Sequence, residues 1–129
     1  MIEPTEQSAF EKSKNIPTFH EKGWGHERWI VNNDKYCGKI LHFKKGKKCS
    51  WHYHKLKDET FYLQSGKLLV QLSDGDDIAL AQSVELESGD SLHIYPGLRH
   101  RMTALQPSDL FEFSTQHFDS DSYRIEKGD

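Results

Sequence analysis

The stretch from Gly46 to Gly66, GKKCSWHYHKLKDETFYLQSG, constrains this 129-residue chain more than any other part of its sequence. It places His52 and His54 two positions apart, with Glu59 following at the start of an apolar run. Side chains of a β-strand alternate between two faces, so the two histidines would point to the same side. Glu59 would bring a carboxylate to the same space from the neighbouring strand. The spacing therefore predicts three ligands around one point.

Two imidazoles and one carboxylate are a ligand set for a divalent transition metal. Nitrogen and oxygen donors together suit iron, manganese, zinc or nickel better than calcium, which prefers an all-oxygen set. A lone pair of histidines at this spacing is often only a pair of surface residues. The flanking glycines and Glu59 add fixed positions, which makes a chance coincidence rare. We therefore expect one divalent metal to bind here.

Length and charge limit what kind of protein this is. A chain of 129 residues is long enough for one domain with a modest core. A formal charge of −3 gives no overall attraction to nucleic acid or to anionic membranes, and we expect neither as a partner. No apolar run approaches the roughly 18 residues of a membrane span, and no signal segment opens the chain. With only Cys37 and Cys49, and no CxxC pair, a reducing cytoplasm is the expected location.

The spacing of apolar runs predicts an all-β fold. Short runs recur at intervals of about 8 to 12 residues without helical periodicity, as in an antiparallel β-barrel or double-sheet jelly roll. We expect turns at Ser65-Gly66 and at Gln106–Asp109. Residues 1–22 show neither the 3.6-residue period of a helix nor the 2-residue period of a strand. They are predicted to form an irregular N-terminal arm, with a helical turn near Ser8–Lys14. Residues 23–129 would form the single β domain.

Two segments of the chain resemble the two signatures of the cupin superfamily. The stretch Gly46–Gly66 resembles the first signature. The segment GDSLHIYPGLRH, Gly89–His100, resembles the second, with Tyr95 where the family usually has a proline. The resemblance places His100 at the family's fourth ligand position and implies a cupin barrel that forms a homodimer. The implied metal ligands are His52, His54, Glu59 and His100.

A closer resemblance is to the isomerase domain of type II mannose-6-phosphate (phosphomannose) isomerases. It is carried by the segments Trp24-Gly25, Gly38–Leu41, Asp58–Thr60 and Asp121–Asp129. Gly23 stands where those enzymes typically have proline, and His52 stands where they commonly have glutamine. The resemblance implies a metal-dependent sugar-phosphate isomerase.

The resemblance also implies roles for individual residues. Aldose–ketose isomerisation moves a proton between adjacent carbons through an enediol, so it needs a base and an anchor for the phosphate. Lys39 and Arg124 are the expected substrate-binding residues. The base would be Glu59, if it is loosely bound to metal, or His93 or Tyr62, and the sequence does not rank these three.

Two other functions use the same fold and ligands. A non-haem iron dioxygenase would use the open metal positions for substrate and oxygen. A non-catalytic cupin would bind a sugar or small anion without turnover. The basic residues near the predicted barrel opening favour a small anionic substrate over the closed, apolar pocket that a dioxygenase needs.

Overall fold

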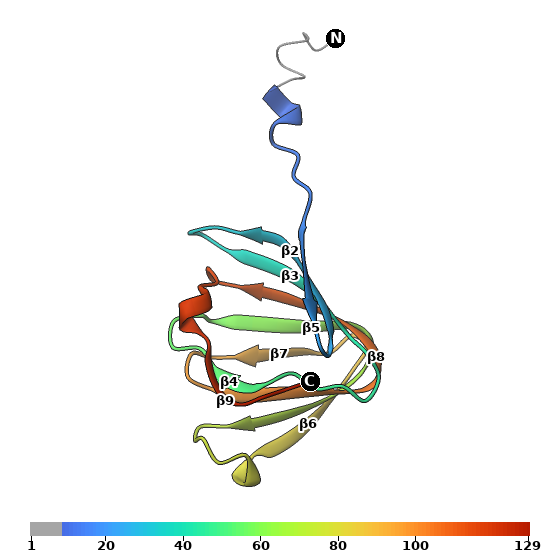
Figure 1. Ribbon diagram of the computed structural model, residues 1–129, viewed down its shortest axis with the longest axis vertical. Helices are drawn as coiled ribbons and strands as arrows, with labels where there is room; N and C mark the ends of the chain where they lie inside the picture. Colours follow the sequence, from blue (N-terminus) through green and yellow to red (C-terminus); the bar gives the residue numbers. More distant parts are fainter. Residues whose placement is uncertain (1–8) are drawn as a thin grey trace.

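Nearly all regular structure in this protein is β-strand. The computed structural model describes residues 9–129 (Figure 1). The strands are β1 (Thr18–Lys22), β2 (Gly25–Asn32), β3 (Cys37–Phe43), β4 (Trp51–Tyr53), β5 (Glu59–Ser73), β6 (Gln82–Glu87), β7 (Ser91–Ile94), β8 (Arg99–Ser114) and β9 (Tyr123–Glu126). Two short 3₁₀ turns are η1 (Ile78–Leu80) and η2 (Asp119–Asp121).

The strands pair antiparallel and curl around one interior. One path through the sheet runs β1-β2-β3-β8-β4-β9, and β5 pairs with β6, β7 and β8. The two long strands β5 and β8 each have partners at both ends, so they tie the two halves of the structure together (Figure 1). The prediction of an antiparallel, all-β barrel or jelly roll is confirmed.

Both predicted turns are bends inside the long strands, and this corrects the sequence analysis. Ser65-Gly66 lies within β5 and Gln106–Asp109 within β8, and the register between the two strands shifts there. Gly66 has φ of +99°, and a Cβ on it would lie 2.3 Å from the carbonyl oxygen of Pro107. Only glycine allows the two bends to face each other so closely. Pro107 is tolerated because the ladder is already irregular at this point.

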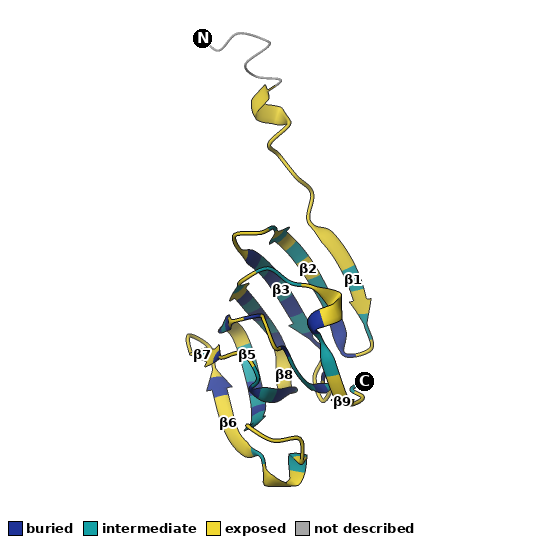
Figure 2. Cartoon of the chain, turned by 90° about the vertical axis from the view of Figure 1, so that its left-hand side faces the viewer, coloured by how far each residue is buried: buried dark blue, intermediate teal, exposed yellow. Residues whose placement is uncertain are grey.

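Period-2 alternation decides which side chains face the interior. On β3, Lys39, Leu41 and Phe43 are buried while their neighbours are only partly buried. Trp24 stacks on Phe43 with ring centroids 4.3 Å apart. In Figure 2 buried residues alternate with partly buried ones along β3, whereas β1 is largely exposed. The core also includes Leu63, Leu68, Val70, Leu86, Ile94, Met102 and Leu110.

The N-terminal arm is shorter than the predicted range of 1–22. Residues 18–22 form β1, which pairs in register with β2, for example Thr18 with Trp29. One helical turn covers residues 9–11, residues 12–17 form no helix or strand, and residues 1–8 of the expected arm lie outside the described residues. Cys37 and Cys49 are both buried and free. Within residues 9–129, no helix is long and apolar enough to cross a membrane.

Candidate metal centre and cavity

Three histidines converge on the inner face of the barrel. His52 lies on β4, His54 follows that strand directly, and His100 lies on β8 opposite His52 in the strand register. The ring centroids of His52 and His100 are 4.3 Å apart. One nitrogen from each of the three rings lies within 4.8 Å of the others. The structure therefore brings together the three predicted histidine ligands.

A backbone carbonyl fixes each imidazole in the tautomer that a metal needs. The Nδ1 atoms of His52, His54 and His100 lie 2.9, 3.0 and 3.0 Å from the carbonyl oxygens of Ser50, Asp121 and Leu98. A carbonyl oxygen only accepts hydrogen bonds, so each Nδ1 carries the proton. Each Nε2 then presents its lone pair to the common space. This arrangement is typical of metal-ligating histidines.

Burial also keeps the histidines uncharged. It lowers the pKa of His54 to about 3 and that of His100 to about 4, and it lowers the pKa of His52 well below its usual value. The positive charge of Lys57 further lowers the pKa of all three histidines. At neutral pH all three rings are therefore free to bind a cation without first losing a proton.

Glu59 supplies a buried oxygen that has no hydrogen-bond partner. Its Oε2 lies 3.6 Å from Nε2 of His54 and 3.4 Å from Nε2 of His100. No residue of the described chain donates a hydrogen bond to this atom. Two ligands of one metal ion, each at about 2.1 Å, lie roughly 3 to 3.5 Å from one another. These distances and the unsatisfied oxygen fit a divalent metal held by His52, His54, His100 and Glu59.

The other oxygen of Glu59 is already occupied. Its Oε1 lies 3.4 Å from Nζ of Lys57, which also contacts Oε2 of Glu112 at 3.0 Å and Nδ1 of His117 at 3.1 Å. Burial opposes charge on Lys57, but Glu112 and Glu59 raise its pKa above the usual value. Burial and the charge of Glu112 raise the pKa of Glu59 to about 8. Glu59 therefore offers one oxygen to a metal, and the bound cation would replace a proton.

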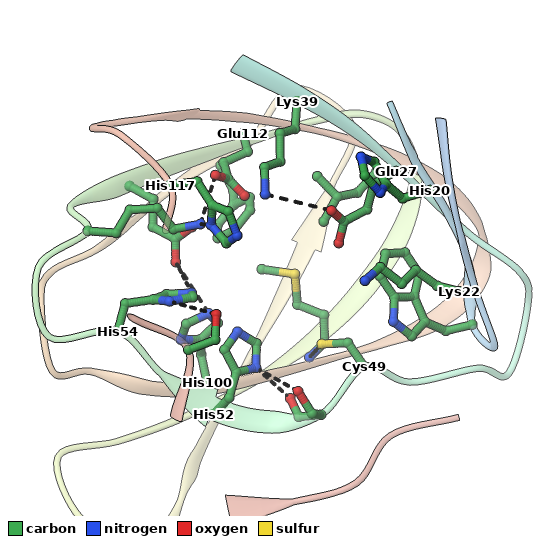
Figure 3. Close-up of a pocket in the computed structure, with 18 of the residues that line it drawn as sticks. His20, Lys22, Glu27, Lys39, Cys49, His52, His54, His100, Glu112 and His117 are labelled. Carbon is green, nitrogen blue, oxygen red and sulfur yellow. Dashed lines mark hydrogen bonds and ion pairs between the residues drawn. The ribbon is translucent and has the colours of Figure 1, made fainter. Parts of the chain in front are cut away.

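The histidines line one side of a cavity of about 610 Å³, a size typical of small-molecule sites. Figure 3 shows Lys39 and Glu27 on the side opposite His52, His54 and His100, with both side chains directed inward. The Nζ atom of Lys39 lies 3.7 Å from Oε1 of Glu27 and 4.1 Å from the ring centroid of Trp29. It donates no hydrogen bond to any residue of 9–129, although the side chain is only 3% exposed. The predicted substrate residue Lys39 therefore faces the candidate metal centre.

His93 and Tyr62 do not reach the cavity, which corrects their prediction as candidate bases. On β5 the inward side chains are Glu59, Phe61 and Leu63, so Tyr62 points outward. On β7 the inward residue is Ile94, and the neighbouring His93 is exposed, with Nε2 2.6 Å from Oδ1 of Asp58. In both cases alternation along the strand places the ring on the outer surface.

Arg124 does line the cavity. It lies on β9, opposite His52 in the strand register, and it is exposed at the cavity opening. Sequence reasoning missed Lys57 and Glu112 as parts of the site. Glu112 could have been found, because it continues the inward alternation of Leu110 on β8, whereas Lys57 lies in a loop without such a pattern.

Replacing one histidine should separate metal ligands from other histidines. We expect His54→Ala to reduce bound metal from about one ion per chain to a small fraction, because the set loses a buried nitrogen. The matched control is His93→Ala, which removes an exposed imidazole outside the cavity and should leave metal content unchanged. Elemental analysis of both purified variants measures this. Equal metal contents in the two variants would contradict the ligand assignment.

Replacing Lys57 should destabilise the fold strongly. Lys57→Met removes the ammonium from between two buried carboxylates, and breaking a buried pair typically costs about 3 to 5 kcal/mol. Lys67→Met is the control, because Lys67 pairs with Glu85 on the surface, where ion pairs contribute about 0 to 1 kcal/mol. Urea unfolding of the metal-free proteins measures both. A similar loss of unfolding free energy in the Lys57→Met and Lys67→Met proteins would show that the contacts of Lys57 are unimportant for stability.

Comparison with known proteins agrees with this architecture. The structure resembles the capsular polysaccharide assembling protein CapF from Staphylococcus aureus, with a TM-score of 0.74 and 17% identity over 88% of this chain and 35% of that one. For oxalate decarboxylase from Bacillus subtilis the TM-score is 0.73, with 17% identity over 84% and 30% of the two chains. The chain thus spans about a third of either protein. For KdgF from Halomonas sp. the TM-score is 0.68, with 18% identity over 80% of this chain and 89% of that one.

At these identities the structural neighbours establish the fold alone. No curated protein matches the sequence. The family model for the cupin domain matches residues 39–111. This match covers more than half of the 129 residues and includes all four candidate ligands. The protein therefore belongs to the cupin family.

Proposed function

We propose that this cupin is a metal-dependent isomerase of a sugar phosphate, similar to mannose-6-phosphate isomerase, that interconverts an aldose and a ketose through an enediol. One observation carries the proposal. A buried lysine that donates no hydrogen bond within residues 9–129, Lys39, faces a set of candidate metal ligands across one cavity. A substrate with an anionic group at one end and a carbonyl at the other would satisfy both sides.

Lys39 is the better of two buried lysines for binding a substrate. Lys57 already contacts Glu59, Glu112 and His117, so its three donors are used. Among the described residues, the Lys39 ammonium has only the distant carboxylate of Glu27 and the face of the Trp29 ring. A buried ammonium that lacks hydrogen bonds gains strongly from an anionic ligand. Arg124, at the opening, would hold the same phosphate from the solvent side.

Glu27 is the best candidate for the base once His93 and Tyr62 are excluded by their position. Four carboxylates line the cavity. Glu59 faces the metal ligands, and Asp119 is 91% exposed. Burial would raise the pKa of Glu112, but Lys57 and Lys39 hold it at about 2, too low for an effective base. Glu27 accepts a hydrogen bond from the Trp29 indole at Oε1, 2.8 Å away, and its Oε2 receives none from the described residues.

These residues divide the reaction between them. A divalent metal held by the three histidines and Glu59 would polarise the carbonyl and the adjacent hydroxyl of the substrate as a Lewis acid. Glu27 would remove the proton from C2 and return it to C1. The hydroxyl proton passes from O2 to O1, so aldose and ketose contain the same atoms. Lys39 would keep the phosphate in place, which orients C2 toward the base.

The known structural neighbours are consistent with this substrate class. The name of CapF links it to the assembly of capsular polysaccharide, and oxalate decarboxylase acts on a small dianion. The charged cavity wall supports an anionic substrate better than the oxygen chemistry of an iron dioxygenase. The metal would be iron, manganese, zinc or nickel, because the ligands combine imidazole with carboxylate.

Proton exchange tests the proposed reaction. A panel of hexose and pentose phosphates is incubated with metal-loaded protein in deuterated water, and NMR follows loss of the C2 proton. We expect exchange that a chelator abolishes, and Glu27→Gln should slow it by about 10²- to 10⁴-fold. Lys39→Met should raise KM about 10- to 100-fold for phosphorylated sugars and much less for unphosphorylated ones, because it removes a contact to phosphate.

Each alternative function gives a different result in the same assays. Oxygen consumption that depends on ferrous iron, without C2 exchange, would replace the isomerase with a dioxygenase. Thermal stabilisation by sugar phosphates without exchange or oxygen use would indicate a binding protein. If exchange occurs but Glu27→Gln retains the full rate, the isomerase stands and Glu27 is not its base.

We also propose a cytoplasmic homodimer. The strand β1 ends its path through the sheet and pairs only with β2 among the described strands, so its outer edge can accept a strand from a second copy. Its Phe19 side chain is exposed beside that edge. Sedimentation equilibrium at micromolar concentration should give twice the chain mass of 15.0 kDa. A mass of 15.0 kDa would contradict the dimer.

A further inference from the structure

One buried aspartate from the C-terminal part of the chain holds the loop that joins the metal ligands. Residues 55–58 connect His54 to Glu59, and they contain no regular structure. Asp121, at the end of η2, is 3% exposed and lies against this loop. Nothing in the sequence pattern links the two segments, which are more than 60 positions apart.

The carboxylate of Asp121 accepts hydrogen bonds from three successive backbone N–H groups. Its Oδ1 accepts from Lys55 at 2.9 Å and from Leu56 at 3.1 Å, and its Oδ2 accepts from Lys57 at 3.0 Å. Hydrogen bonds to a carboxylate are stronger than those between neutral groups. Three of them on adjacent residues leave the loop little freedom to change shape.

The same residue also orients a ligand directly. The backbone carbonyl of Asp121 accepts the hydrogen bond from Nδ1 of His54, 3.0 Å away, and thereby leaves Nε2 free for a metal. At the other end of the loop, Lys57 contacts Oε1 of Glu59 and leaves Oε2 free. Asp121 therefore acts on both sides of the ligand pair, through its main chain on His54 and through the loop on Glu59.

We propose that Asp121 is a positioning residue of the metal centre and that η2 is thereby part of this centre. Asp121 fixes the distance and direction between His54 Nε2 and Glu59 Oε2 before a metal binds. The strand β9, which follows η2, pairs with β4, so the same C-terminal segment is anchored beside His52 as well. The inference concerns metal binding alone and does not depend on the isomerase.

The test compares Asp121→Ala with a core variant of similar size. Leu86→Ala shortens a buried side chain that does not line the cavity. Cobalt(II) affinity is measured by competition with a chromophoric chelator, and the visible absorption of the cobalt-loaded protein reports ligand geometry. We expect Asp121→Ala to weaken cobalt binding about 10- to 100-fold and to change the spectrum. Leu86→Ala should lower the melting temperature but keep cobalt affinity within about twofold of the original protein.

Two further measurements make the result decisive. Amide hydrogen exchange at Lys55, Leu56 and Lys57 should accelerate in Asp121→Ala, because the acceptor of all three groups is gone. If the alanine variant does not fold, Asp121→Asn replaces it in the test. Asparagine keeps the size of the side chain but loses one hydrogen-bond acceptor. We expect it to weaken cobalt binding in the same direction but by a smaller factor. Unchanged affinity and spectrum, an equal affinity loss in Leu86→Ala, or no cobalt binding by the original protein would each overturn the proposal.

Discussion

The candidate metal centre depends on a buried ammonium group, that of Lys57. Its Nζ lies among Glu59, Glu112 and His117, and the side chains of Lys57 and both glutamates are shielded from water. Removing charges from water costs several kcal/mol per ion, and this cost is recovered only where geometry and hydrogen bonding are good. The Lys57 ammonium pairs with the Glu112 carboxylate, and the raised pKa of Glu59, about 8, keeps a proton on this second carboxyl group at neutral pH until a cation binds. A divalent cation at the histidines would replace that proton, which explains why Glu59 Oε2 has no hydrogen-bond partner among residues 9–129.

The two buried lysines of the cavity have different roles, one in holding a metal ligand in place and one in binding an anion. Lys57 is saturated by its neighbours and holds Glu59 in one orientation, whereas Lys39 keeps its donors free on the opposite wall. Both side chains are buried to a similar extent, so burial does not distinguish them. Their hydrogen-bond partners do. A lysine with satisfied donors belongs to the scaffold, and one with unsatisfied donors indicates where an anion would bind.

The parts of this structure that follow from alternation were predictable, and those that depend on distant contacts were not. His52, His54 and Glu59 could be placed together because a period of 2 fixes their directions, and the same rule groups Lys39 with Leu41 and Phe43 on one face of β3, which the structure shows to be the buried one. Applied to β5, the rule would also have excluded Tyr62. The sequence predicted a turn at Gly66, where the chain in fact bends within β5. A glycine with positive φ is compatible with a turn and with a bend inside a strand, and only the pairing with β8 distinguishes the two.

The residues that support the metal ligands lie later in the chain than the ligands themselves, and this affects how the site assembles. All four candidate ligands lie between positions 52 and 100, yet Glu112 and Asp121, which support Glu59 and His54, come later. Asp129 also contacts the first signature segment, because its Oδ2 accepts a hydrogen bond from the Lys48 N–H at 2.9 Å. The ligand loop therefore lacks its hydrogen-bond acceptor until η2 is in place. In physical terms the metal centre is completed by contacts of high sequence separation, which form only after their loop-closure entropy has been overcome.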